Sequence, residues 1–588
     1  MAVPRGPPGL EEKTLVRDPG KAHLRPLPAR LLSAAWVVFA AAGCFFASAA
    51  AAQPFDRPVQ EMREETPDFA DPGQPELTPP ATSMLPALPV AGADQPELQV
   101  RVQGFRIAGS TVFSEAQLAA ALEPWRGREI GSEDLLAIRN AITQLYVDAG
   151  YPNSGALIPD QDLSDGFIEI AIVEGVLTRI DVTGTQHYRP SVLRKRIAGG
   201  VHRPLRLQDV ELALQQLQQD PRIERISARL SPGERAGEAV LALRVEEARP
   251  YRVSLQASNY TPVAFGSYRG SFRLAHENVL GFGDTLETRF RVSGGLFRFG
   301  GQYDFPVNRW GTTLLARGEY SSSSIIEDEF ETLDIDTDYR AVRIGVKHPV
   351  YRSERSTVEL GLLADWRQTD TTLLDSPFSF PGSGAVDGRT TVTPLRFLGS
   401  WTLRDRNQVI AARSLLSYGL PILGAKSSVQ DGPNGQFLAW LGQFQWARRY
   451  DFLGLETIFR TDAQFVNDPL PTLEQFAVGG HLTVRGYREN QQVRDYGVIS
   501  SLELRVPLWR TERPILEVAP FADFGWSKNW ERPTPGREIL ASVGLGLRWA
   551  ITEQVRAQVY WGYQIQSVDT SGDLQDDGVQ FSLTWDAF

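Results

Sequence analysis

The chain has 588 residues, of which 42% are hydrophobic and 22% charged, and its formal net charge is −11 at pH 7. The acidic balance disfavours a nucleic-acid partner, which would need clustered Lys and Arg, and the lack of repeated apolar runs of about 20 residues excludes a helical membrane transporter. One cysteine and six scattered histidines exclude an internal disulfide and the usual zinc motifs, so we expect neither a metal nor a cofactor.

Residues 1–52 are predicted to be a secretory signal peptide. Their apolar stretch, Leu31–Ala52, follows two arginines and ends in small residues that fit a cleavage site before Gln53. A membrane anchor is the alternative, and the missing basic flank after the stretch disfavours it. Cys44 suggests lipidation, but the two phenylalanines after it continue the apolar run, so we discount a lipid anchor. Removal of the signal leaves no cysteine, which suits an oxidising compartment.

Residues 53–97 are predicted to form an extended linker. Ten prolines lie in this stretch, a density that prevents a packed core and favours polyproline conformation. The one candidate helix in it, Val59–Glu65, is short and lies between two prolines.

Two α/β modules are predicted next, over residues 98–176 and 177–249. Both follow the order strand, helix, helix, strand, strand, which indicates an internal repeat. The expected elements of the first module are Val100–Ala108, Phe113–Leu122, a helix from Ser132 to Gly150, Ala156–Ile158 and Phe167–Val173. Those of the second module are Thr178–Val182, Arg189–Ile197, Leu207–Gln219, Ile223–Leu230 and Ala239–Val245.

Local signals in the first module support these assignments. Ser132 is expected to be the N-cap of its helix, with Glu133 and Asp134 placed favourably in the first turn, and Gly150 ends the helix. Asp165-Gly166 is a hairpin turn signal. Such a sheet leaves an edge that could bind an extended chain by strand addition, although modules that serve only as spacers are the alternative.

Residues 250–588 are predicted to form an antiparallel β-barrel of sixteen strands. From Tyr251 onward apolar and polar residues alternate with a period of two, as in Leu286, Thr288, Phe290 and Val292. Eleven of the thirteen tryptophans lie beyond residue 250, which fits interfacial aromatic girdles and disfavours a soluble sandwich. The polar face is rich in charged residues and suits a hydrated lumen. Further alternating segments are Val358–Trp366, Leu395–Leu403, Leu438–Trp446, Leu455–Phe465, Leu516–Trp526, Val555–Tyr563 and Val579–Trp585.

Three sets of residues resemble the two-partner secretion transporters, also called haemolysin secretion and activation proteins. The stretch from Gly150 to Gly175, with Pro159, Asp162 and Gly166, resembles the first POTRA (polypeptide-transport-associated) domain of that family. The words Val484-Arg485-Gly486-Tyr487 and Phe521-Ala-Asp523-Phe-Gly525 resemble its paired loop and strand motifs. A further match is Asn278–Asp284, which resembles an early turn of the same barrels.

The resemblance implies a specific role for the long connection at about residues 466–497. In the family this loop folds into the barrel lumen, and its arginine contacts acidic residues of the wall. Arg485 is therefore expected to pair with Asp523, which alternation places inward, while Glu503 is a second candidate partner. Gly486 is expected to allow close backbone approach.

The resemblance also implies a function. An outer-membrane transporter with two periplasmic POTRA domains would capture a large unfolded exoprotein, such as an adhesin or haemolysin with an N-terminal secretion domain, and export it through the barrel. Its other expected partners are outer-membrane lipid and the outer-membrane insertion machinery. Phe588 resembles the terminal aromatic residue of proteins delivered to that machinery, although alternation places it on the face opposite to Phe581 and Trp585. No catalytic site is expected, and His481 is interpreted as a solvated loop residue. An outer-membrane assembly factor of the same superfamily and a general diffusion porin are the alternatives.

Overall fold

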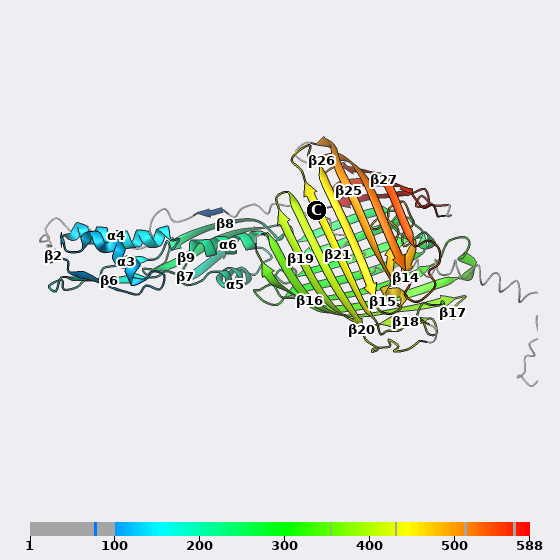
Figure 1. Cartoon of the computed structure of the whole chain (residues 1–588), viewed down its shortest axis with the longest axis horizontal. Coiled ribbons are helices and arrows are strands. Elements are labelled where there is room, and N and C mark those ends of the chain that lie inside the picture. The colour runs from blue at the N-terminus through cyan, green and yellow to red at the C-terminus, as the bar shows by residue number, and fades with distance from the viewer. Residues whose placement is uncertain are drawn as a thin grey trace, which may run out of the picture. The chain divides into compact units, whose positions relative to one another are not determined.

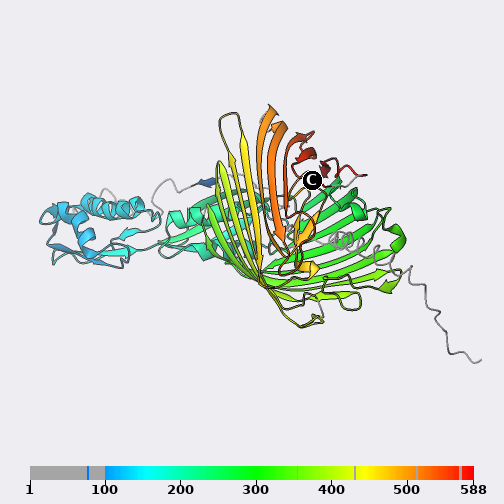
Figure 2. The ribbon, with the colours of Figure 1, turned by 45° about the vertical axis from the view of Figure 1, so that its right-hand side comes forward.

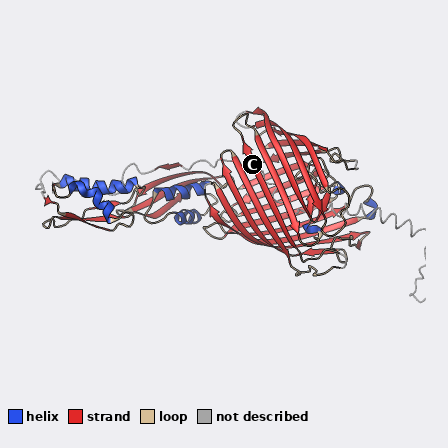
Figure 3. Cartoon of the chain, in the orientation of Figure 1, coloured by secondary structure: helices blue, strands red, loops and turns tan. Residues whose placement is uncertain are grey.

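The computed structural model describes residues 76–78, 100–353, 355–429, 432–510, 514–568 and 572–587. The predicted signal peptide, the candidate helix at 59–65, Cys44 and Phe588 lie outside the described residues. Helices gather in the N-terminal modules, whereas strands build the wall of a barrel (Figure 3). No helix in the described ranges is both long and apolar enough to cross a membrane.

The first module packs two helices against a three-stranded sheet of order β3-β6-β5. Its buried core joins apolar residues of both helices to the sheet, among them Leu118 and Ile142. A further pair of very short strands, β2 and β4, closes the module on one side. The elements are β2 (Val100–Arg101), β3 (Gly104–Ala108), α3 (Glu115–Leu122), the 3₁₀ turn η1 (Glu123–Trp125), β4 (Glu129–Ile130), α4 (Ser132–Asp148), β5 (Gly155–Leu157) and β6 (Phe167–Val173).

Two local predictions for this module are wrong. The N-cap of α4 is Gly131, and Ser132 is the first helical residue. The backbone N–H of Gly131 donates to the Asp134 carboxylate at 3.0 Å. The strand expected from 100 to 108 is split in two. Val102 buries its side chain and bonds to Arg128 rather than to the neighbouring strand, so the chain changes sheets at this point.

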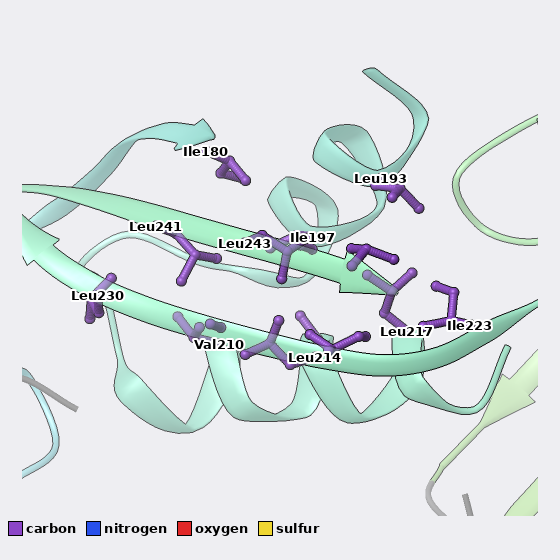
Figure 4. Packing of buried hydrophobic residues seen from close by; sticks show 14 of the residues in the cluster. Ile180, Leu193, Ile197, Val210, Leu214, Leu217, Ile223, Leu230, Leu241 and Leu243 are labelled. Atoms are coloured by element: carbon purple, nitrogen blue, oxygen red, sulfur yellow. The ribbon is translucent and has the colours of Figure 1, made fainter. Parts of the chain in front are cut away.

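The second module repeats the same order around its own apolar core. Its elements are β7 (Val176–Thr183), α5 (Pro190–Gly200), α6 (Leu207–Gln218), β8 (Ile223–Pro232) and β9 (Glu238–Glu247). Residues of α6 that recur at helical spacing, Val210, Leu214 and Leu217, point into one cluster with Leu241 and Leu243 of the sheet (Figure 4). The periodicity of 3.6 on the helix and 2 on the strand produces this shared face.

Part of the predicted linker is a strand of the second module. Residues Glu76–Thr78 form β1, which pairs in parallel with β8, so that the sheet has the order β1-β8-β9-β7. Leu77 packs against the apolar core of the module. The stretch is therefore more than a tether at this point. An extended, proline-flanked segment already has a backbone close to that of a strand, and the edge of β8 supplies the partners.

Apart from one small two-stranded hairpin, the remaining strands form a single barrel (Figures 1 and 2). Every neighbour pair in it is antiparallel, and β29 pairs with β10 to close it. The described residues form sixteen long strands, and short β17 (Ser376–Pro377) and β18 (Arg389–Val392) extend the wall beside β16. The predicted fold class is thereby confirmed. The long strands are β10 (Tyr251–Ser258), β11 (Arg269–Glu277), β12 (Thr285–Ser293), β13 (Leu296–Pro306), β14 (Thr313–Ser324), β15 (Ile335–Arg352), β16 (Ser356–Leu373), β19 (Pro394–Asp405), β20 (Gln408–Gly419), β21 (Leu438–Arg449), β22 (Glu456–Val466), β25 (Tyr496–Arg510), β26 (Pro514–Lys528), β27 (Ile539–Ala550), β28 (Val555–Gln564) and β29 (Val579–Asp586).

The two faces of the barrel wall differ as the alternation predicts. Outward positions carry large exposed apolar side chains, for example Leu545 and Leu547 on β27 beside Trp561 on β28. Inward positions carry buried charged and polar groups. Trp310 and Phe452, both highly exposed, lie in turns at the end of the barrel from which the chain enters β10. Such a continuous apolar exterior with aromatic residues at its rim is the surface that a lipid bilayer requires.

The turn Asn278–Asp284, between β11 and β12, contacts the second module. The backbone N–H of Arg189 donates to the carbonyl of Gly281 at 3.0 Å, and the Nε of Arg189 donates to the carbonyl of Leu280 at 2.9 Å. The same guanidinium lies 4.3 Å from the ring centre of Phe282. Gly281 has a φ of +86°, and a Cβ there would lie 2.8 Å from the His187 carbonyl oxygen, so the contact requires glycine.

A buried carboxylate organises the same side of the second module. Asp220 accepts from the hydroxyl of Tyr188 and from Nη1 of Arg196, each at 2.7 Å, and from Nη1 of Arg222 at 3.0 Å. Burial raises the pKa of Asp220, but the guanidiniums of Arg222 and Arg196 lower it by more, so the group stays ionised. Arg222 also donates to Thr285 of β12 at 2.8 Å and so joins this network to the barrel.

The packing of Leu77 yields a first prediction. In Leu77→Asp a carboxylate replaces the apolar side chain that fixes β1, so we expect β1 to leave the edge of β8. Hydrogen exchange of the full-length protein should then become faster at residues 227–229 and stay unchanged in β9. Glu76→Gln, which alters an exposed neighbour of Leu77, is the matched control. Unchanged protection of residues 227–229 in Leu77→Asp would contradict the assignment of β1.

Candidate functional site

The candidate site is built by the connection between β22 and β25, residues 467–495, which we call the lumenal loop. It contains the 3₁₀ turn η4 (Thr472–Glu474) and a small hairpin of β23 (Phe476–Val478) and β24 (Gln492–Arg494). Nearly all residues from 470 to 495 are buried. Since the wall residues they contact face inward, the loop lies inside the barrel.

Arg485 is the centre of the densest group of polar contacts between loop and wall. Its backbone N–H and its Nε both donate to Oδ2 of Asp523, at 3.0 and 2.8 Å, and its Nη2 donates to Oδ1 at 2.9 Å. Its Nη1 donates to Glu503, and its Nη2 also donates to the hydroxyl of Ser501 at 3.1 Å. Arg485 as a whole is 6% exposed, so these bonds form with little water present.

Aromatic rings complete the surroundings of Arg485. Its guanidinium carbon lies 3.8 Å from the ring centre of Phe521 and 4.9 Å from that of Tyr560. Phe521 is two residues before Asp523 on β26, so both side chains point to the lumen. The spacing of the strand motif therefore has a physical reason, because one residue pairs with the charge of the arginine and the other covers its face.

The acidic partners reach Arg485 because the strand register is regular here. Ser501 is opposite Asp523 and Glu503 is opposite Phe521 in the pairing of β25 with β26. All four residues therefore share the inner face. Glu503 also accepts from Nε of Arg505 at 2.8 Å, and Arg505 donates to Glu456 at 3.2 Å. Acidic and basic side chains thus alternate along this part of the wall.

Glycines bring the loop backbone against the wall. Gly486 has a φ of +92°, and a Cβ there would lie 2.7 Å from the carbonyl oxygen of Gly562 on β28. A Cβ on Gly525 of β26 would lie 2.4 Å from a methyl carbon of Val478 in the loop. These positions admit no larger residue without displacing the loop.

Val484 and Tyr487 hold the same segment by burial and by hydrogen bonding. Both are fully buried in an apolar cluster that contains loop residues such as Phe476 and inward leucines of the wall such as Leu398. The Tyr487 hydroxyl lies 2.9 Å from the carbonyl oxygens of Ala541 and Gln566, and its one hydrogen is shared between these two acceptors. All four residues of the loop word are therefore fixed to the wall.

The POTRA residues singled out from the sequence lie far along the chain, in the loop between β5 and β6. Oδ1 of Asp162 accepts from the backbone N–H of Ser164 at 3.0 Å, and the carbonyl of Pro159 accepts from Gln161 at 3.2 Å. Gly166 has a φ of +72°, and a Cβ there would lie 2.8 Å from a side-chain carbon of Gln103. These contacts shape the loop itself.

The expectation for His481 is wrong. Its ring stacks on Tyr260 of the barrel, with ring centres 3.7 Å apart, and its Nδ1 lies 2.6 Å from a carboxylate oxygen of Glu489. The side chain is 19% exposed, so it is a packed residue rather than a solvated one. The stacked ring and the carboxylate favour this placement, and Tyr260, which lies outside the loop, could not be located from the loop sequence.

Sequence reasoning missed several loop contacts. Arg488 donates to Asp576 at 2.5 and 2.9 Å and to Glu327 at 2.9 Å, which joins the loop to two other connections on the same side of the barrel. Asp495 accepts two bonds from Arg532, at 2.8 and 2.9 Å. The position of Arg488, directly after Tyr487, was the only available signal.

The arrangement holds a segment in place, and the groups around it offer no metal site. In the described part of the chain, no group of three or more His, Cys, Asp or Glu side chains could bind a metal ion. What the geometry provides is a folded loop attached to the inner wall by ion pairs, glycine contacts and apolar packing.

Comparisons with known proteins agree with this architecture. Residues 237–549 match the model of the haemolysin secretion/activation protein family ShlB/FhaC/HecB, and residues 100–175 match the ShlB-type POTRA domain. The chain belongs to this family. It is 26% identical over 406 residues to the outer membrane transporter CdiB of Escherichia coli, with 65% of each chain covered, so it spans just under two thirds of that relative's length.

A second relative and a solved structure extend the likeness. The chain is 27% identical over 458 residues to the outer membrane transporter CdiB-2 of Burkholderia pseudomallei, covering 73% of this chain and 72% of the relative. The solved structure of CdiB from Escherichia coli superposes with a TM-score of 0.60 at 22% identity, over 86% of this chain and 94% of that one, and so shows the same fold. The chain is an outer-membrane protein with its N-terminal modules on the periplasmic side.

The contacts of Arg485 yield a second prediction. A cysteine at Thr483, which is buried beside Arg485, should react slowly with a maleimide in an otherwise cysteine-free chain. Arg485→Ala leaves Asp523 buried without its partner, which costs about 3–5 kcal/mol. We expect labelling to become several-fold faster, and equally so in Asp523→Ala.

The double variant should label little faster than either single variant, because both substitutions remove the same contact. Heat-modifiable migration on gels serves as the control for an intact barrel. Additive effects of the two substitutions, or unchanged labelling in Arg485→Ala, would show that the pair does not hold the loop.

Proposed function

We propose that this protein recognises an unfolded partner exoprotein in the periplasm and secretes it through its β-barrel. The observation that carries the proposal is the lumenal loop, a folded segment attached to the inner wall by Arg485 inside a closed barrel. A barrel through which only small solutes diffuse would need no such loop. A loop that can leave the lumen fits a conduit that has a resting state and a conducting state.

The modules supply the recognition step in this proposal. The domain limits we propose are 98–176, 177–249 and 250–588. In the second module the edge of β8 accepts β1 in parallel, which supports strand addition as the mode of capture. The corresponding edge in the first module is β5, which pairs with β6 on its other side. Pro159, Asp162 and Gly166 shape the loop next to that edge and would act by positioning it.

The family description supports a polypeptide cargo, because it names haemolysin secretion. A large exoprotein with an N-terminal secretion domain, such as an adhesin or haemolysin, is the proposed partner. The sequence contains no nucleotide-binding motif, so the proposed driving force is folding of the cargo outside the cell. Outer-membrane lipid and the insertion machinery are the other proposed partners.

An assembly factor that inserts other barrels is the second candidate. The match of the first module to the ShlB-type POTRA domain favours secretion. A diffusion porin is disfavoured by the modules and by the attached loop.

Deletion of residues 98–249 yields a third prediction. The barrel should still insert and migrate in a heat-modifiable way, because its strands pair only with one another. Export of its partner exoprotein should be lost, as measured by the amount of that exoprotein in the culture medium. Arg485→Ala should also strongly reduce export while leaving the barrel inserted.

Two results would contradict the proposal. Wild-type export by the deletion variant would reduce the modules to spacers. Normal export in cells that lack the whole chain, with loss of other outer-membrane proteins instead, would favour the assembly factor.

A further inference from the structure

A second charged residue of the lumenal loop is buried against the wall, and its sign is opposite to that of Arg485. Glu474 ends the turn η4 and is 2% exposed. Its two carboxylate oxygens accept from Nη2 of Arg396 at 2.7 and 2.9 Å. Arg367 lies 3.8 Å from the same carboxylate. The carbonyl of Glu474 also accepts from Gln464 at 3.1 Å, so both its backbone and its side chain are held.

The wall residues around Glu474 form a connected group. Arg396, which is 1% exposed, also donates to Asp365 at 2.9 Å and to the hydroxyl of Ser417 at 2.5 Å. Asp365 accepts from Arg343 at 2.7 and 2.9 Å and from Arg367 at 3.1 Å. Three guanidiniums therefore surround one wall carboxylate, and the wall alone has an excess of positive charge at this place.

The two loop contacts are electrostatic opposites. Around Arg485 the wall contributes Asp523, Glu503 and Glu456 with the guanidiniums of Arg505 and Arg449, so its formal charge is −1. Around Glu474 the wall contributes three guanidiniums with one carboxylate, so its formal charge is +2. In each case the loop residue reduces the excess by one. Neither wall group is neutral without the loop, which makes both contacts costly to remove.

The two contacts lie on different parts of the barrel. Arg396 belongs to β19, whereas Glu503 and Asp523 belong to β25 and β26, and the strands β20, β21 and β22 lie between them. Apolar packing supports the Glu474 side as well. Leu470 and Leu473 of the loop are fully buried in a cluster with Tyr339 and Val392 of the wall. The loop is thus attached at two separate stretches of wall.

We propose that Glu474 is a second anchor of the lumenal loop, a positioning residue that works in parallel with Arg485. With two anchors in parallel, the lumenal loop stays attached to the wall by one ion pair when the other separates. The loop clears the lumen only when both ion pairs separate. The link to export rests on the proposed function, but the anchor itself is a property of the barrel and is tested without cargo.

The test measures ion conductance of the purified full-length protein in planar lipid bilayers. Glu474→Gln keeps the size of the side chain and removes its charge. Alone it should raise the frequency of high-conductance openings about two-fold. In the Arg485→Ala background it should raise that frequency at least ten-fold, more than the product of the single effects, because both proposed anchors are then absent.

The matched control is Glu319→Gln. Glu319 is also a lumenal carboxylate with arginine partners, but its ion pairs run to Arg298 and Arg317 on the wall itself. It should not change the openings in either background. Glu474→Asp, which keeps the charge, should give a smaller increase than Glu474→Gln and provides a second variant if the latter fails to insert.

The partner is tested by Arg396→Gln. Since Arg396→Gln and Glu474→Gln remove the same contact, their combination should open no more often than the stronger single variant. Three results would overturn the proposal: no effect of Glu474→Gln in the Arg485→Ala background, an equal effect of Glu319→Gln, or independent effects of Arg396→Gln and Glu474→Gln. None of these depends on whether the protein exports a polypeptide, so the two proposals fail separately.

Discussion

A charged side chain inside a closed barrel needs an opposite charge, and this requirement shapes the lumen. Closure of β29 on β10 removes the sheet edges and leaves the alternate side chains of every strand facing one enclosed space. The wall around Asp523 and the wall around Asp365 each carry an uneven number of acidic and basic groups. Arg485 and Glu474 each reduce this imbalance by one charge, and both come from one loop.

The opposite polarity of these contacts makes the position of the loop specific. If the loop turned around, Arg485 would lie among guanidiniums and Glu474 among carboxylates. Repulsion at both places would disfavour that arrangement. Glycine contacts add a steric condition, because Gly486 fits against Gly562 only when the backbone lies directly on the wall. Charge selects the region of wall, and shape then selects the register.

The sequence was sufficient for features that repeat and insufficient for those that depend on distant partners. Alternation extends through β26 without a bulge near Asp523, so its inward direction could be predicted, and the glycine at 486 was expected to permit close approach. Glu474 has no motif around it, and its partner Arg396 lies 78 residues away along the chain. His481 was misjudged because Tyr260, on which it stacks, comes from the first barrel connection.

The ends of elements were harder to predict than the elements themselves. Gly131 replaces Ser132 as the cap of α4, since the reciprocal bond to Asp134 uses a backbone N–H that any residue has. Strand β1 could not be predicted, because three residues between prolines are too few to show the alternation of apolar and polar residues that identifies a strand. Their role is visible only when the open edge of β8 is known.

That short strand also sets a threshold for any other chain that seeks the same edge. Because β1 is joined to the module through its own backbone, its pairing with β8 is intramolecular, with an effective concentration on the order of millimolar. A competitor arriving from solution must therefore bind more residues of β8 than the three that β1 covers, or supply a side chain that fits the pocket of Leu77 better. Short peptides that bind weakly therefore do not displace β1. A longer segment that pairs as a strand along more of β8 can take its place.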